Sequence, residues 1–157
     1  MNPRPGRLRL HGAASERAAL DWSWVSGRLA SAGTYWVVAK TSAVPHPRPV
    51  WGTWHDDRLH LSIGSPTITR ELHSDPIVAV HLESGTDVVI VEGSVLTDST
   101  TAEMIDHYNR KYDWDYRIGE YGELTIVQPV KVLAWQAAGW AGRESFQATG
   151  CWLFDRP

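Results

Sequence analysis

The middle of the chain constrains the fold most strongly, because it consists of short strand-like segments separated by turn residues. Between Thr34 and Leu96, runs rich in β-branched and aromatic residues alternate with glycine, proline and aspartate. Leu59, Leu61 and Ile63 are separated by polar residues, as expected for a half-buried strand. Strands that follow one another through hairpins close into a small barrel or sandwich.

Two longer helices and one short helix are expected beside these strands. Ser15 to Ala32 carries apolar residues at helical spacing, with Ser15 as a cap and Gly33 just beyond the end. Ile68 to Ser74 is long enough for one or two helical turns. Thr100 and Glu103 have the spacing of a capping box and predict the start of the second longer helix.

The remaining pattern predicts six or seven antiparallel strands in one domain. Residues 1–14 are expected to form a flexible tail, and residues 15–157 a single mainly β domain with flanking helices. Pro129 is expected at an edge or a bulge. The predicted strands are Thr34–Thr41, Val50–Trp54, Leu59–Ile63, Ile77–Leu82, Val88–Leu96, Leu124–Trp135 and Phe146–Phe154. The proline-rich segment Pro45–Pro49 is expected to form a turn and the entry to the second strand, and His55–Asp57 a hairpin turn. Loops are expected at Lys111–Glu123 and Gln136–Ser145.

Composition excludes several classes of protein. The 157 residues are 43% apolar and carry a net charge of −3 without a basic run, so neither nucleic acid nor a membrane surface is an expected partner. No stretch approaches the ~18 apolar residues that a membrane-spanning helix needs. The single cysteine, Cys151, cannot form an internal disulfide and fits a buried position in a protein of the reducing cytoplasm. The nine tryptophans indicate either a pocket for a flat ring or burial at a dimer interface.

The residues show no active site that works without a cofactor. Nucleophile elbows, phosphate-binding glycine loops and zinc-binding helix motifs are absent. Of the seven histidines, His60 and His81 are expected at outward strand positions, and a metal site formed by histidines of different strands stays a minor alternative. The carboxylate pair at Asp56 and Asp57 is explained by turn formation. A bound cofactor that supplies the reaction chemistry is therefore the leading hypothesis.

Several segments resemble, in order and spacing, the pyridoxamine 5'-phosphate oxidase-like family, the split barrels that use flavin or deazaflavin. The resemblance covers about two thirds of the chain. The matching segments are Thr34–Val38, Pro47–Trp54, Arg58–Ser62, Arg70–Pro76, His81–Gly85, Val88–Gly93, and Tyr108 with Lys111–Tyr112. The expected fold is therefore the FMN-binding split barrel.

The resemblance also implies a cofactor site and a partner. Members of this family are typically homodimers that hold FMN or the deazaflavin coenzyme F420 in a groove between subunits. The implied functions are oxidoreductase activity and hydride transfer with a small organic substrate, without a protein nucleophile; the catalytic residues are unknown and no metal is expected. The implied cofactor-binding residues are Arg48, Val50, Trp51, Ser62, Ile63, Thr67 and Arg70.

The chain departs from the family at two places. Many members carry an Arg-Lys pair where this chain has Thr67-Ile68-Thr69, and an arginine before the tryptophan where it has Cys151-Trp152. The missing positive charge keeps an alternative open, in which the barrel binds flavin, heme or tetrapyrrole without catalysis or has lost its cofactor. True pyridoxamine 5'-phosphate oxidase activity is disfavoured, because the sequence ends soon after Trp152 without the substrate-binding tail of those enzymes.

Overall fold

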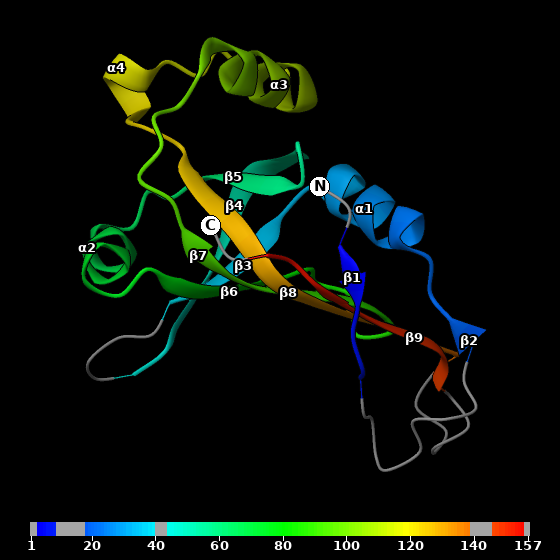
Figure 1. The fold of residues 1–157 in the computed structure, drawn as a ribbon. Helices are drawn as coiled ribbons and strands as arrows, with labels where there is room; N and C mark the ends of the chain where they lie inside the picture. The colour runs from blue at the N-terminus through cyan, green and yellow to red at the C-terminus, as the bar shows by residue number, and fades with distance from the viewer. Residues whose placement is uncertain (1–2, 9–17, 40–43, 139–145, 156–157) are drawn as a thin grey trace.

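The protein folds around a closed antiparallel barrel of six strands (Figure 1). The structure is a computed structural model, and it describes residues 3–8, 18–39, 44–138 and 146–155. The split barrel expected from the sequence is confirmed. In order around the barrel, its strands are β8 (Thr125–Ala137), β5 (Arg58–Ser62), β4 (His46–His55), β3 (Tyr35–Ala39), β6 (Ile77–His81) and β7 (Asp87–Val95), and β7 pairs with β8 to close the ring.

Three further strands extend the sheet from β8. Strand β9 (Phe146–Leu153) pairs antiparallel with β8, and the two-residue strands β1 (Arg4–Pro5) and β2 (Ala18–Ala19) pair with β9. The Gly6 N–H also donates to the Cys151 carbonyl at 2.8 Å. Part of the segment expected as a flexible tail is therefore bonded to the last strand.

Strand β4 is longer than expected, and it changes partners halfway along. His46 to Val50 pair with β3, whereas Trp51 to His55 pair with β5. Pro45–Pro49 was expected to form a turn and the entry to this strand, and its last four residues belong to the strand. Among the described residues, no strand pairs with the edge of this half of β4 that faces away from β3. A proline there, which has no N–H to donate, therefore removes no hydrogen bond between strands.

Turns and bulges shape the barrel at the expected places. Asp56 and Asp57 both have positive φ, 53° and 56°, and join β4 to β5 as a tight hairpin. Pro129 lies opposite Gly93 where the register between β7 and β8 shifts. A Cβ on Gly93 would lie 2.5 Å from the Gln128 carbonyl oxygen, so the two strands approach each other too closely there for a side chain. Of the two roles expected for Pro129, the structure shows the bulge.

Helix α1 (Trp22–Ser31) is shorter than the predicted helix from Ser15 to Ala32. Ala18 and Ala19 form β2 instead, since they complete hydrogen bonds to β9, and the expected cap at Ser15 lies outside the described residues. Helix α2 (Pro66–Ser74) begins two residues before the predicted Ile68, because Pro66 can occupy the first turn and Ser65 caps it.

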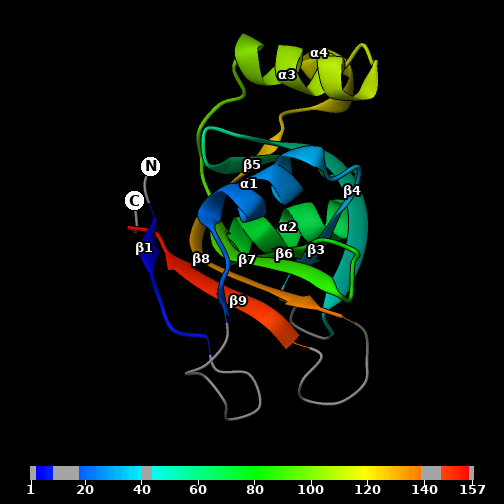
Figure 2. The same ribbon diagram turned by 90° about the vertical axis from the view of Figure 1, so that its right-hand side faces the viewer.

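Helix α3 (Ala102–Tyr112) is capped by Thr101 rather than by Thr100. The Thr100 hydroxyl instead accepts the Leu124 N–H at 2.8 Å, which ties the segment before α3 to the one before β8. The segment expected as a loop from Lys111 to Glu123 contains a one-turn helix, α4 (Ile118–Tyr121). Figures 1 and 2 both show α3 and α4 together at one end of the barrel.

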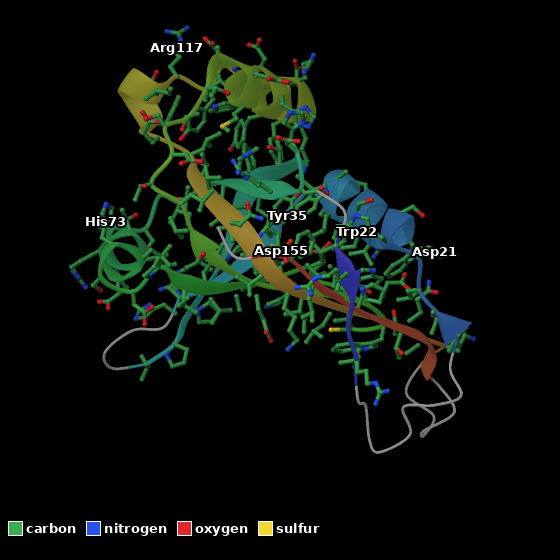
Figure 3. The ribbon with its side chains drawn as sticks, in the orientation of Figure 1. Asp21, Trp22, Tyr35, His73, Arg117 and Asp155 are labelled. Carbon is green, nitrogen blue, oxygen red and sulfur yellow. The ribbon has the colours of Figure 1, made fainter. Side chains whose placement is uncertain are left out.

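The hydrophobic core fills the barrel and continues beneath α1, which lies across the barrel in Figure 2. Trp22, at the start of α1 (Figure 3), contacts the rings of Trp54, Trp152 and Phe154 at 5.4 to 6.1 Å between centroids. Three of the nine tryptophans thus serve core packing. Cys151 is buried, as expected. Across the described residues, no helix combines the length and apolar character needed to cross a bilayer.

Candidate functional site

A pocket of about 400 Å³ opens where the two halves of β4 meet, beside the end of β5 and the start of α2. Its floor follows from strand register, because Trp51 pairs directly with Ser62 and both side chains therefore project from the same face of the sheet. Helix α3 contributes one wall. The lining residues are Arg48, Pro49, Val50, Trp51, Ser62, Gly64, Ser65 and Tyr108.

Four of the seven residues that the sequence nominated line this pocket: Arg48, Val50, Trp51 and Ser62. Ile63 follows Ser62 and packs against the barrel core. Thr67 and Arg70 lie on α2 outside the lining, and the Arg70 side chain is 70% exposed and forms an ion pair with Glu71 at 3.4 Å. The structure thus assembles the strand-borne residues and leaves the helix-borne pair apart from them.

Sequence reasoning missed Ser65, whose position had a readable signal. Its hydroxyl accepts the Ile68 N–H at 3.4 Å, and Pro66 follows it as the first helical residue. A serine before proline at the start of a helix is a standard capping arrangement. Because Ser65 caps α2, the positive end of the helix dipole lies at the rim of the pocket, where it favours negative charge.

Tyr108 was also missed as a pocket residue. It is 2% exposed, and its phenol lies at the pocket beside the Ser62 hydroxyl. Burial raises the pKa of Tyr108 to about 12, against a smaller lowering by Ser62. Burial also raises the pKa of the neighbouring Tyr116, again opposed by Ser62. The pocket therefore contains a phenol that keeps its proton at neutral pH and can donate it in a hydrogen bond.

The indole of Trp51 is held by a stacked partner. It lies parallel to the Tyr112 ring, with centroids 4.9 Å apart and an interplanar angle of 8°, and Trp114 contacts its edge at 6.0 Å. Because Trp51 is still 46% exposed, its free face is available to a ligand. Tyr112 and Trp114 are thus packed against the wall of the pocket.

Gly52 is the point where α3 is attached to the barrel. Its N–H donates to the Tyr112 hydroxyl at 2.9 Å, and that hydroxyl lies 2.8 Å from the Gly52 carbonyl oxygen. The Lys111 ammonium donates to the same carbonyl at 2.8 Å and to the Tyr35 hydroxyl at 2.9 Å. Tyr35, which is labelled in Figure 3, in turn donates to the Leu29 carbonyl at 2.5 Å, so the connection runs from α3 through the barrel to α1.

The Lys111 ammonium is the most perturbed cation near the pocket. Burial lowers the pKa of Lys111 to about 8. The ammonium also lies over the faces of the Tyr35 and Tyr112 rings, 4.8 and 5.3 Å from their centroids. It therefore remains mostly charged at neutral pH, stabilised by two oxygen acceptors and two aromatic faces.

Of the two strand histidines, His81 agrees with the expectation and His60 does not. His60 was expected at an outward, exposed or half-exposed position; its side chain does leave the barrel interior, but it is 1% exposed because α3 covers that face. His81 is half-buried, with its ring stacked on Trp36. Within the part of the chain that the structure describes, no three histidine, cysteine or carboxylate side chains are placed to hold a metal ion.

Comparison with known proteins identifies relatives by structure only. No family model and no curated protein matches the sequence. Among solved structures, a FAD-binding protein from Mesorhizobium loti matches with a TM-score of 0.57 and 13% identity, over 86% of this chain and 96% of its own. An F420 reductase matches with a TM-score of 0.51 and 16% identity, over 66% and 92%.

A FAD-binding protein from Mycobacterium smegmatis also matches, with a TM-score of 0.51 and 14% identity, over 87% of this chain and 99% of its own. At these identities the likeness concerns the fold, and in each case it covers nearly the whole of the solved chain. The resemblance to the pyridoxamine 5'-phosphate oxidase-like proteins seen in the sequence thus extends to three dimensions, and this chain has their split-barrel fold.

Proposed function

We propose that the protein binds a flavin-type cofactor, FMN or coenzyme F420, in the pocket between β4, β5 and α2, and that it is an oxidoreductase. The observation that carries the proposal is the composition of this pocket. It combines an exposed aromatic face, one guanidinium, three hydroxyls and the start of a helix. A flat ring with an anionic tail needs this combination. The FAD-binding and F420 reductase structures with the same fold support this proposal.

Each lining residue has a role that its chemistry suits. Trp51 provides a face for ring stacking, and Tyr112 behind it keeps the indole in place. Arg48 and the Ser65-capped start of α2 attract the anionic tail. Ser62 and the protonated Tyr108 offer hydrogen bonds to polar edges of the ring. A bound flavin or deazaflavin ring supplies the hydride chemistry itself, so the protein needs no nucleophile of its own.

The family resemblance nominated two arginines for the anionic tail, and the structure favours one of them. Arg48 lines the pocket, whereas Arg70 lies outside the lining and is paired with Glu71. The Arg48 guanidinium contacts only the Pro47 carbonyl at 2.8 Å and a His46 ring nitrogen at 3.4 Å, among the described residues, so its charge is not neutralised by a carboxylate. We infer that Arg48 is the principal cation of the site.

A homodimer completes the proposed site. The pocket is open, and the Trp51 indole beside it is 46% exposed. A second copy of the chain placed against this opening would cover the cofactor and exclude water from a small organic substrate. The reducing cytoplasm is the compartment we propose, in keeping with a single, buried cysteine.

The proposal is tested by titrating the purified protein with FMN, FAD and F420 in separate absorbance experiments, with native mass spectrometry to count bound cofactor per subunit. We expect FMN or F420 to bind with a dissociation constant of about 1 µM or lower. Heme is added in a parallel titration. Binding of heme alone would favour the non-catalytic alternative, and binding of none of the four would contradict the proposed function.

The alternative of a non-catalytic binder also has an observation in its favour. With Arg70 apart from the pocket, Arg48 is the one cationic side chain among the described residues that lines it. One guanidinium and a helix start hold a phosphate less tightly than a group of cations does. A barrel that binds a flavin weakly, or binds a ring without a phosphate, is therefore the second candidate.

A further inference from the structure

His60 is buried without any hydrogen-bond partner for its ring. It is 1% exposed, and both ring nitrogens lack partners among the described residues. The hydroxyl of Thr53, which is 0% exposed, lacks a partner as well. Buried polar atoms are normally hydrogen-bonded, and each one left unpaired is costly. Three such atoms in one place therefore mark an unusual contact.

Strand register shows where these atoms lie. His60 pairs directly with Thr53, two residues along the hairpin from the pair formed by Trp51 and Ser62. Side chains two residues apart on a strand share a face, so the polar pair and the pocket floor lie on the same side of the sheet. Helix α3 covers this face, because Tyr108 lines the pocket and the His107 ring lies 4.8 Å from that of His55. The helix thus rests partly on unpaired polar atoms.

More basic than acidic side chains surround His60. The His55 ring, on β4, lies 6.3 Å away, and Arg58 lies two residues before His60 on β5. Helix α3 contributes His107, with Arg110 and Lys111 beyond it. The negative groups are Asp56 in the hairpin and Glu103 on α3, whose carboxylate lies 3.4 Å from the His55 ring nitrogen. The Arg58 guanidinium itself donates hydrogen bonds to the side chains of Gln128, at 3.0 Å, and Asp98, at 3.5 Å.

This setting disfavours a charge on His60 while α3 is in place. Burial is the largest cause, followed by His55, Arg58 and His107, and together they lower the pKa of His60 to about 4. If α3 moves away, the ring reaches water and its pKa returns toward the ordinary value of about 6.5. The open form then binds a proton more strongly than the closed form. Lowering the pH through the range between these two pKa values therefore favours opening.

We propose that α3 is an acid-released lid: protonation of the buried His60 ring separates α3 from the β4–β5 hairpin while the barrel stays folded. The lid carries Tyr108, a wall of the pocket, and Tyr112, the stacking partner of Trp51. Release of α3 would therefore dismantle the pocket. The proposal concerns this protein's own contacts and holds whether or not the pocket binds a flavin.

The test follows amide exchange and histidine side-chain signals by NMR in the ¹⁵N- and ¹³C-labelled protein from about pH 7.5 to about pH 4.5. After correction for the intrinsic pH dependence of exchange, the α3 amides should lose protection on the order of tenfold or more below about pH 6, while β6 and β7 stay protected. His60→Phe removes the titrating group and should keep α3 protected in acid.

Two further variants keep the test decisive. His107→Gln removes one neighbouring charge and should shift the opening to lower pH, which is informative even if His60→Phe fails to fold. His73→Gln changes an exposed histidine on α2, away from α3 in Figure 3, and should leave the transition unchanged. Loss of protection in α3, β6 and β7 at the same pH, or full protection of α3 down to about pH 4.5, would overturn the proposal.

Discussion

Replacing Gly52 by alanine is expected to destabilise the protein by about 3 kcal/mol and to lower its melting temperature by roughly 10 °C. A Cβ at this position would lie 2.5 Å from Leu61 Cδ2 and 2.7 Å from the His60 carbonyl oxygen. The second contact is with backbone, which cannot rotate away. Strands β4 and β5 would have to separate where Tyr112 and Lys111 attach α3. Thermal unfolding followed by circular dichroism measures the effect.

Replacing Gly27 by alanine provides a control, because the expected change in stability has the opposite sign. Gly27 lies exposed within α1, and a Cβ there would meet nothing within 4 Å. Gly27→Ala should therefore stabilise the protein by about 0.5–1 kcal/mol, because alanine loses less backbone entropy in a helix. If Gly52→Ala unfolds within a degree or two of the wild type, the close approach of β4 to β5 at the pocket is wrong.

Trp51→Ala is expected to weaken binding of the proposed cofactor about tenfold or more, which corresponds to ~1.4 kcal/mol or more of lost stacking. The indole lines the pocket, is 46% exposed and is backed by Tyr112. Because the side chain is only half-buried, its removal should cost little folding stability. The measurement is the dissociation constant of FMN and of F420 for the folded variant.

Two neighbouring substitutions separate stacking from general disturbance of the pocket. Trp51→Phe keeps a flat face and should restore part of the affinity. Trp114→Ala removes a ring of similar exposure, 47%, that touches the edge of Trp51 without lining the pocket, and should change affinity about twofold at most. Equal losses for Trp51→Ala and Trp114→Ala would argue against a cofactor stacked on Trp51.

The strands of the barrel were predictable, because each pattern is local. Alternating residues and the Asp56-Asp57 turn located the β4–β5 hairpin correctly. The residue pattern began this strand only at Val50, although the family resemblance covered Pro47–Trp54, since proline excludes a strand only where its N–H must enter a ladder, and that depends on which neighbours pair with it. The start of α1 was misplaced for a similar reason: Ala18 and Ala19 pair with β9, which is far away in the sequence.

The candidate site shows the same difference between local patterns, which the sequence reveals, and contacts between distant segments, which it does not. Arg48, Val50, Trp51 and Ser62 lie on two strands joined by a hairpin, so the family resemblance nominated residues that the fold brings together. Tyr108 and the buried state of His60 both depend on where α3 docks, about 50 residues further along the chain. No local sequence pattern encodes that contact. The hairpin residues His60 and Thr53 beneath α3 are polar, so no apolar stripe marked this face of the hairpin as buried.

In the proposed complex, an anionic flavin-type cofactor occupies the pocket beside Arg48. The most direct measurement compares the dissociation constants of FMN and F420 for the wild type, Arg48→Ala and Arg70→Ala under the same conditions. The proposal predicts a loss of about tenfold or more for Arg48→Ala, since a guanidinium–phosphate contact is worth about 1.5–3 kcal/mol, and less than about threefold for the exposed Arg70. Unchanged binding by Arg48→Ala, or a larger loss for Arg70→Ala, would contradict the assignment of the cofactor to this pocket.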